Sequence, residues 1–145
     1  MRIEITKLTD DRHRLTIRRD DGSTESVELE TRSYLLHDLV HYAVEAEAGI
    51  EDGFWGLLAR GTTMADLSDR TMANPISPGI ARAETLVGPM QSVHNGRLDP
   101  ALYVEQLGVD MAFVDRVRER LRALWGHWRA TPFRGVMELE WPPAK

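Results

Sequence analysis

Two histidines stand four residues apart in the segment His37-Asp38-Leu39-Val40-His41, and Glu45 follows one helical turn later. On a helix, residues at positions i and i+4 share one face, so these two imidazoles can bind a single metal ion. Zinc hydrolases with an HExxH helix use such a pair, and the glutamate between the histidines serves as their general base. Asp38 stands where that glutamate would be, and its shorter side chain reaches less far toward a metal-bound water.

A third ligand has to come from elsewhere in the chain or from further along the same helix. Glu45 lies two turns beyond His37, which is ~12 Å along a helix axis, so both cannot easily bind one ion. His94 continues the apolar face of a later predicted helix and should point inward. We therefore predict His37, His41 and His94 as ligands of a divalent metal ion such as zinc. Asp38 and Glu45 are the predicted catalytic residues, because either carboxylate can move a proton beside that ion.

The same residues allow interpretations without a metal ion. The stripe formed by His37, Asp38, His41 and Glu45 can equally be a solvated polar face or a hydrogen-bonded network. An inward-facing His94 can instead bind a carboxylate or a backbone carbonyl. The sequence leaves all three alternatives open.

The N-terminal part of the chain alternates between polar and apolar side chains in three short segments, which is typical of half-buried β-strands. Asp20-Asp21-Gly22-Ser23 supplies turn residues between the second and third segments. We therefore predict an antiparallel meander, with His13 exposed between two arginines. The residues expected to face the core are Ile3, Ile5, Leu15, Ile17, Val27 and Leu29.

Apolar residues then recur with helical spacing between breaks rich in Gly, Pro and Asn. Thr31 is the expected N-cap of the first helix, and Gly49 is its expected end. Gly88-Pro89 should kink or split a later helix. The predicted helices span residues 31–49, 51–61, 80–94, 100–107 and 111–130, with one further turn at 64–69 and a last strand at 136–141.

This order of strands, helices and a final strand indicates an α+β fold. We predict a single domain over residues 1–145, in which an N-terminal three-stranded antiparallel meander and a C-terminal strand pack on about five helices. A last strand that returns to the meander would complete a four-stranded sheet with the helices on one face.

The chain has 145 residues, of which 42% are hydrophobic and 28% charged, the composition of a folded domain. Its formal net charge of −5 disfavours a nucleic-acid partner, because phosphates require a basic surface. The lack of cysteine excludes disulfides, thiolate catalysis and cysteine-ligated metals. No apolar run suits a membrane span, and Met1-Arg2-Ile3-Glu4-Ile5 is unlike a signal peptide. We therefore expect no membrane partner and a cytoplasmic location.

Part of the chain resembles a pattern found in small bacterial proteins. Two segments carry it, His37-Asp38-Leu39-Val40-His41-Tyr42-Ala43-Val44-Glu45 and Asp52-Gly53-Phe54-Trp55-Gly56-Leu57-Leu58-Ala59-Arg60-Gly61. They match a core of the form HDLxHYxVE … GFxGLxAxG over residues 34–61, under a quarter of the chain. The resemblance implies a bacterial origin and brings no activity with it. Gly53 and Gly56 would let the two predicted helices approach each other closely.

The function expected from the sequence is a binding or accessory role for a small molecule or a protein. Its polar pocket would lie on the stripe of His37, Asp38, His41 and Glu45. The alternative is a metal-dependent hydrolase in which His37 and His41 bind the ion. A third hypothesis is a structural or oligomer-forming module with an exposed apolar patch. That patch would consist of Met64, Met72, Ile76 and Met90. Enzymatic activity, substrate and oligomeric state are left open by the sequence.

Overall fold

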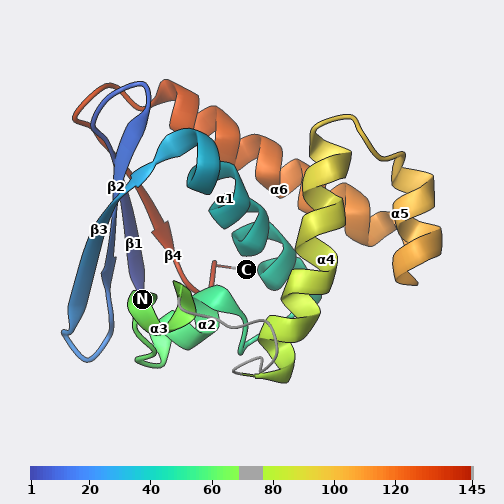
Figure 1. Ribbon diagram of the computed structural model, residues 1–145, viewed down its shortest axis with the longest axis horizontal. Helices are drawn as coiled ribbons and strands as arrows, with labels where there is room; N and C mark the ends of the chain where they lie inside the picture. Colours follow the sequence, from blue (N-terminus) through green and yellow to red (C-terminus); the bar gives the residue numbers. More distant parts are fainter. Residues whose placement is uncertain (69–76, 145) are drawn as a thin grey trace.

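The fold is α+β, as predicted, and the computed structural model describes it for residues 1–68 and 77–144. Four antiparallel strands form one sheet in the order β3-β2-β1-β4 (Figure 1). The C-terminal strand pairs with the first strand, which confirms that the two ends of the chain meet in the sheet. The strands are β1 (Arg2–Lys7), β2 (Arg12–Arg18), β3 (Thr24–Glu30) and β4 (Val136–Glu140).

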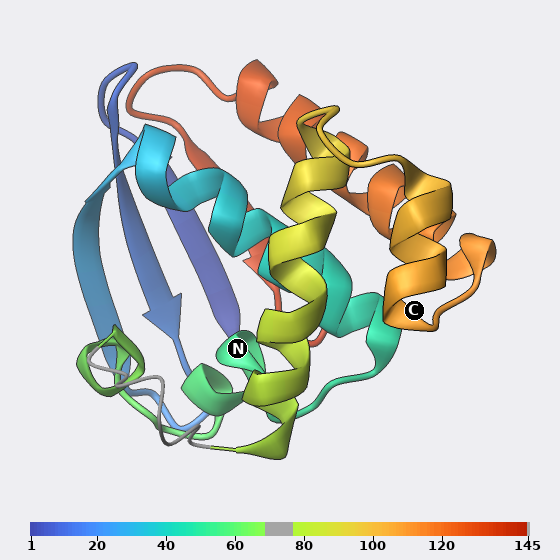
Figure 2. The same ribbon diagram turned by 45° about the vertical axis from the view of Figure 1, so that its right-hand side comes forward.

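The two faces of the sheet follow the alternation of its side chains. Ile3 and Ile17, which are paired across β1 and β2, are completely buried under the helices. The opposite face meets solvent and carries cross-strand ion pairs such as Arg14–Glu28, at 2.9 Å. Figures 1 and 2 show the helices gathered on one side of the sheet. An antiparallel sheet with one packed face and one solvated face therefore forms the base of the molecule.

The helices cover the inner face of the sheet, and α1 lies next to it in both views (Figures 1 and 2). The fourth helix runs through Gly88-Pro89 as one continuous helix, so the split that was one of the two expected outcomes does not occur. No helix among the described residues combines the length and apolar character needed to cross a lipid bilayer. The helices are α1 (Thr31–Ala48), α2 (Phe54–Ala59), α3 (Met64–Ser68), α4 (Pro78–His94), α5 (Pro100–Leu107) and α6 (Met111–Ala130).

The start of α1 differs from the prediction because Thr31 is not its N-cap. Glu30 occupies that position without a capping hydrogen bond from its side chain. The Thr31 hydroxyl instead lies 3.1 Å from His13 Nδ1. The prediction that His13 is exposed was wrong, since its exposed fraction is 1% and its ring packs edge-on against Trp128. His13 shares the inward parity of Leu15 on β2, and this parity outweighs its arginine neighbours.

Two features fix the far end of α1. Gly49 ends the helix in the left-handed conformation, with φ of 66°, as its residue type predicts. Glu47 of α1 lies 3.9 Å from Arg116 and 3.8 Å from Arg120. Both arginines belong to α6, so these contacts join the longest helix to α1.

The apolar patch proposed for an oligomer-forming module is not found as predicted. Met90 is completely buried in the core and cannot contribute to an exposed surface. Met64 is half-buried at the start of α3. Met72 and Ile76 lie outside the described residues.

We predict that His13 makes the fold sensitive to mild acid. Burial, and secondarily the Arg12 charge, lower the pKa of His13 from 6.5 to about 4. The neutral ring is thus the stable form in the fold, and its stabilisation is present above pH 6.5 and lost as the pH falls through about 4. Over this range the wild-type protein should lose on the order of 2 kcal/mol of unfolding free energy through this residue. Urea unfolding at several pH values measures the loss.

His13→Phe should remove this part of the pH dependence, while costing about 1 kcal/mol at neutral pH through the lost Thr31 contact. His127→Gln is the matched control, because His127 is exposed on α6. The same acid sensitivity in His13→Phe and wild type would contradict the assignment.

Candidate metal centre

His41 is held in the interior by a carboxylate on its own helix. The exposed fraction of the residue is 1%, and its Nδ1 lies 2.8 Å from Glu45 Oε2, one turn further along α1. With Glu45 ionised, Nδ1 carries the proton and donates it to this oxygen. The other ring nitrogen, Nε2, then presents its lone pair. A carboxylate that orients a histidine in this way is a common support for metal ligands.

The Glu45 carboxylate is itself fixed by the start of α2. Its Oε2 accepts the backbone N–H of Phe54 and its Oε1 that of Trp55, each at 3.0 Å. Gly53, the residue before α2, makes room for this contact, since a Cβ there would overlap the Glu45 carboxyl group. The close approach expected at Gly53 is therefore present. Both carboxylate oxygens of Glu45 are engaged, which makes Glu45 an anchor for His41.

The neighbouring helix α4 supplies partners to both histidines. His37 Nδ1 lies 3.2 Å from the side-chain oxygen of Gln91, and His41 Nε2 lies 3.7 Å from Glu84 Oε1. Positions rise along α1 as they fall along α4, so the two helices run in opposite directions where they meet. Because Gln91 accepts from Nδ1 of His37, that ring also offers Nε2 as a ligand atom.

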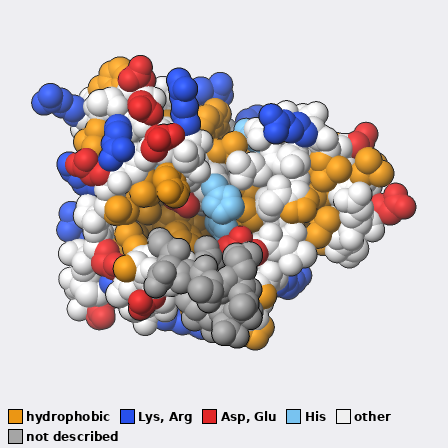
Figure 3. Space-filling model, viewed as in Figure 1, with side chains coloured by type: hydrophobic (Ala, Val, Ile, Leu, Met, Phe, Trp, Pro, Cys, Tyr) orange, Lys and Arg blue, Asp and Glu red, His pale blue; other side chains and the backbone are white. Residues whose placement is uncertain are grey.

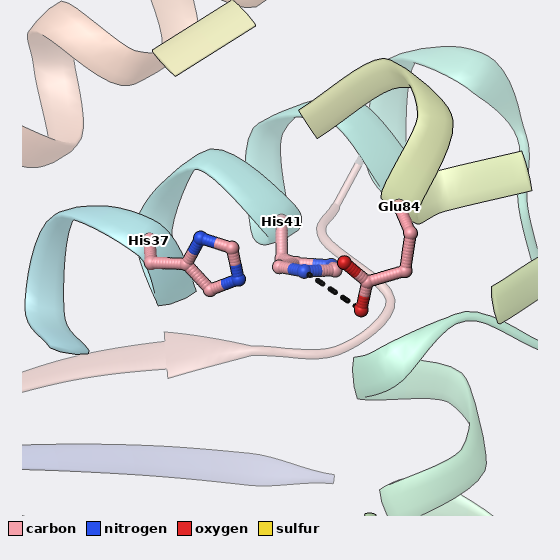
Figure 4. Close-up of side chains that lie close together, drawn as sticks. All are labelled: His37, His41 and Glu84. Atoms are coloured by element: carbon pink, nitrogen blue, oxygen red, sulfur yellow. Dashed lines mark ion pairs between the residues drawn. The ribbon is translucent and has the colours of Figure 1, made fainter. Parts of the chain in front are cut away.

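His37, His41 and Glu84 form a group that can hold a metal ion, which we call the His-His-Glu cluster (Figure 4). One ligand atom from each residue can be chosen so that all lie within 4.8 Å of one another. The two imidazole rings meet edge to face with centroids 4.8 Å apart. Ligands bound at ~2.1 Å to a tetrahedral ion stand ~3.4 Å apart, so small side-chain rotations would complete the site.

The spacing between His41 and Glu84 bears on two electrostatic arrangements. A protonated His41 bridging Glu45 and Glu84 would hold Nε2 within ~2.9 Å of the second carboxylate. The observed 3.7 Å is longer than that. It lies within the range of an ion pair and is also near the ligand–ligand distance across a tetrahedral ion, so the spacing suits either arrangement.

His94 and Glu45, the other predicted members of the site, lie outside the cluster. His94 is exposed at the last turn of α4, although it was expected to face inward. It lines a separate cleft of about 240 Å³ with Trp125 and Arg118. Burial, and secondarily the Arg118 charge, lower the pKa of His94. Of the polar residues of α4, Glu84 rather than His94 lies beside His37 and His41.

Asp38 is the second unusual acid of the site. Its side chain is half-buried, and burial raises its pKa from 3.8 to about 7, against the smaller opposing effect of His41. No hydrogen bond to this carboxyl group is found within the described ranges. Its backbone oxygen accepts the Trp55 indole N–H at 3.2 Å. A carboxyl group that titrates near neutral pH is suited to proton transfer.

Asp38, His37 and His41 line a common cavity of about 610 Å³, the sheet-edge pocket. Its volume lies within the range of small-molecule sites. Figure 3 shows a hollow walled by hydrophobic side chains with a histidine at its edge. The lining residues are Leu15, Glu25, Ser26, Val27, Leu29, Tyr34, His37, Asp38, His41, Phe54, Met64, Ala65 and Leu67.

Glu84 and Gln91 were missed at the level of sequence. Glu84 follows the buried Ala83 and stands at the margin of the apolar face of α4, where a carboxylate usually meets solvent. Its position was a weak signal. Only the packing of α4 across α1 shows which of its polar residues reaches the histidines.

We predict that Glu45 is needed for stability and for the orientation of His41. Glu45→Ala should lower the unfolding free energy by about 3–5 kcal/mol, because it leaves a buried imidazole and two backbone amides without their acceptor. Glu45→Gln should cost less, since its amide oxygen can still accept. Urea unfolding measures both. Glu51→Gln, an exposed change nearby, is the control, and equal stability of all three variants would exclude this role.

No protein-family model, curated protein or solved structure matches this chain. The resemblance to small bacterial proteins therefore stays a prediction. The candidate centre is defined by its own geometry, as a pair of histidines and a carboxylate at the edge of a pocket.

Proposed function

We propose that this protein binds a divalent transition-metal ion through His37, His41 and Glu84, and that the ion serves a ligand in the sheet-edge pocket. The observation that carries the proposal is the convergence of these three ligand atoms within 4.8 Å of one another. The hydrogen bonds that Nδ1 of His37 and Nδ1 of His41 donate to Gln91 and Glu45 support it, because each ring then has its Nε2 lone pair as the ligand atom.

The donor set favours zinc. Two imidazoles and one carboxylate are a known ligand set of catalytic zinc sites, and iron(II) is the other ion that this set suits. Structural zinc sites are closed by four protein ligands, whereas a three-ligand site keeps a position for water or substrate. Since His37 and His41 also line the pocket, we place that open position toward the pocket.

Hydrolysis is the second candidate function, and Asp38 favours it. A bound zinc ion would lower the pKa of a coordinated water and polarise a carbonyl group. Asp38 would take the proton released when the water oxygen attacks the carbonyl carbon. It would then return a proton to the leaving group as the carbonyl–heteroatom bond breaks, so an ester yields an acid and an alcohol. In the metal-free fold burial raises the pKa of Asp38 to about 7, and a carboxyl group with a raised pKa is suited to both accepting and donating a proton.

We predict that the purified, untagged protein binds one equivalent of zinc after treatment with a chelator. His41→Ala and Glu84→Ala should weaken zinc binding by at least about 100-fold, and Gln91→Ala by about 10-fold, because Gln91 only orients a ligand. Competition with a chromophoric chelator measures the affinities, and circular dichroism verifies the fold of each variant.

His94→Ala is the matched control for these variants. It removes a histidine from α4 at a place away from the cluster, so zinc binding should be unchanged. Loss of zinc binding in His94→Ala, or its retention in a folded His41→Ala, would refute the proposed ligand set.

Asp38→Asn should separate the proton-transfer role from the metal site. We expect zinc affinity to be nearly unchanged, and metal-dependent hydrolysis of p-nitrophenyl esters to fall by about 100-fold or more. The rise of the wild-type rate with pH that reports Asp38 ionising should be lost with it. An active Asp38→Asn with the wild-type pH profile would remove Asp38 from the mechanism.

The same variant has a stability signature. Because the fold raises the pKa of Asp38 from 3.8 to about 7, the fold favours the protonated carboxyl group, and the wild type loses stability as the pH rises from about 3.8 to about 7. In metal-free protein at about pH 8, Asp38→Asn should therefore be more stable by on the order of 2 kcal/mol.

A further inference from the structure

The inner face of the edge strand β3 is less well covered than that of its neighbours. Along β1 and β2 the inward residues are buried, whereas Val27 and Leu29 on β3 are only half-buried. Both residues line the sheet-edge pocket. The pocket is thus bounded on one side by apolar side chains of β3.

Side-chain contacts at the opposite end of β3 hold the elements that form the pocket in place. Arg19 is largely buried and pairs with Glu25 of β3, and it donates to the backbone oxygens of Leu58 and Thr62. Glu25 also accepts the backbone N–H of Met64, at the start of α3. These contacts hold α2 and α3 against the strand. The Arg19 guanidinium also compensates the negative charge of Glu25, which lines the pocket.

The two histidines and Asp38 lie on one wall of the pocket, whereas the other walls are mainly apolar, although β3 also contributes Ser26 and the ion-paired Glu25. His37, Asp38 and His41 all come from α1, while Val27 and Leu29 belong to the facing strand. Phe54, Met64 and Leu67 extend the apolar lining from α2 and α3. A ligand that fills this space needs one polar group at α1 and an apolar body along β3.

We infer that the sheet-edge pocket binds the apolar acyl chain of a carbonyl or carboxyl compound, with its polar head at the His-His-Glu cluster. The cavity of about 610 Å³ accommodates a medium-length chain. The inference rests on the proposed metal site for the position of the head group. The position of the chain rests on the apolar walls alone.

The test compares acetohydroxamic acid with octanohydroxamic acid by calorimetry, in zinc-loaded and in chelator-treated protein. Each methylene buried in the pocket should raise affinity about three- to fourfold. This gain with chain length should appear in both forms of the protein, and zinc should tighten both compounds by a common factor. The hydroxamate group serves as a metal-binding stand-in for the carbonyl head.

Val27→Trp should fill the pocket and abolish the gain with chain length, while zinc and acetohydroxamic acid still bind. Glu28→Trp is the matched control, since it adds the same side chain to the exposed face of the same strand. Zinc binding with no gain from the longer chain would overturn the acyl inference and leave the metal site standing. A gain that Val27→Trp removes, in a protein that binds no zinc, would keep the apolar pocket and refute the metal head-group site. A gain that Val27→Trp leaves intact would place the chain elsewhere and overturn the inference.

Discussion

The carboxylate of Glu45 is the contact on which the site depends. It is buried within α1, where it accepts one hydrogen bond from His41 and two from the first amides of α2. An ionised carboxylate is costly to bury unless such donors compensate it. The positive end of a helix adds to that compensation. One side chain thus positions α2 against α1 and also fixes which ring nitrogen of His41 carries the proton.

The remainder of the site follows from how α1 divides its surface. Its apolar face enters the core beside the sheet, and its polar stripe turns toward α4, α2 and the pocket. His41 is completely enclosed because α4 crosses it, while His37 and Asp38 stay half-buried where the sheet-edge pocket opens. The raised pKa of Asp38 has the same origin, since the apolar walls that form the pocket also deprive this carboxyl group of water.

Local rules accounted for most of the fold. Alternation located the four strands, and Gly49 marked the end of the first helix where the structure has it. Each of these depends on a few neighbouring residues. The prediction for His13 was wrong because its arginine neighbours were given more weight than its inward position in the alternation of β2. The prediction for Thr31 was wrong because its hydroxyl contacts His13 and does not cap the helix. A side-chain contact between two elements, such as that of Thr31 with His13, depends on tertiary packing and cannot be predicted from neighbouring residues alone.

The site was partly predictable for the same reason. Spacing alone placed His37 and His41 together on α1, and it indicated that another segment must complete their surroundings. It could not show that α4 passes in the opposite direction, bringing Glu84 to His41 and Gln91 to His37. His94 satisfied the helical pattern, yet it lies at the end of α4, where α6 and its Trp125 are the neighbours. The register between two helices decides which polar residue becomes a ligand.

The most direct measurement is anomalous diffraction at the zinc absorption edge, from crystals of the untagged protein grown with zinc. The account predicts one strong peak about 2.0–2.2 Å from Nε2 of His37, Nε2 of His41 and a carboxylate oxygen of Glu84, with the remaining position open to the pocket. A map without a peak there, in which Nε2 of His41 hydrogen-bonds Glu84 directly, would contradict it.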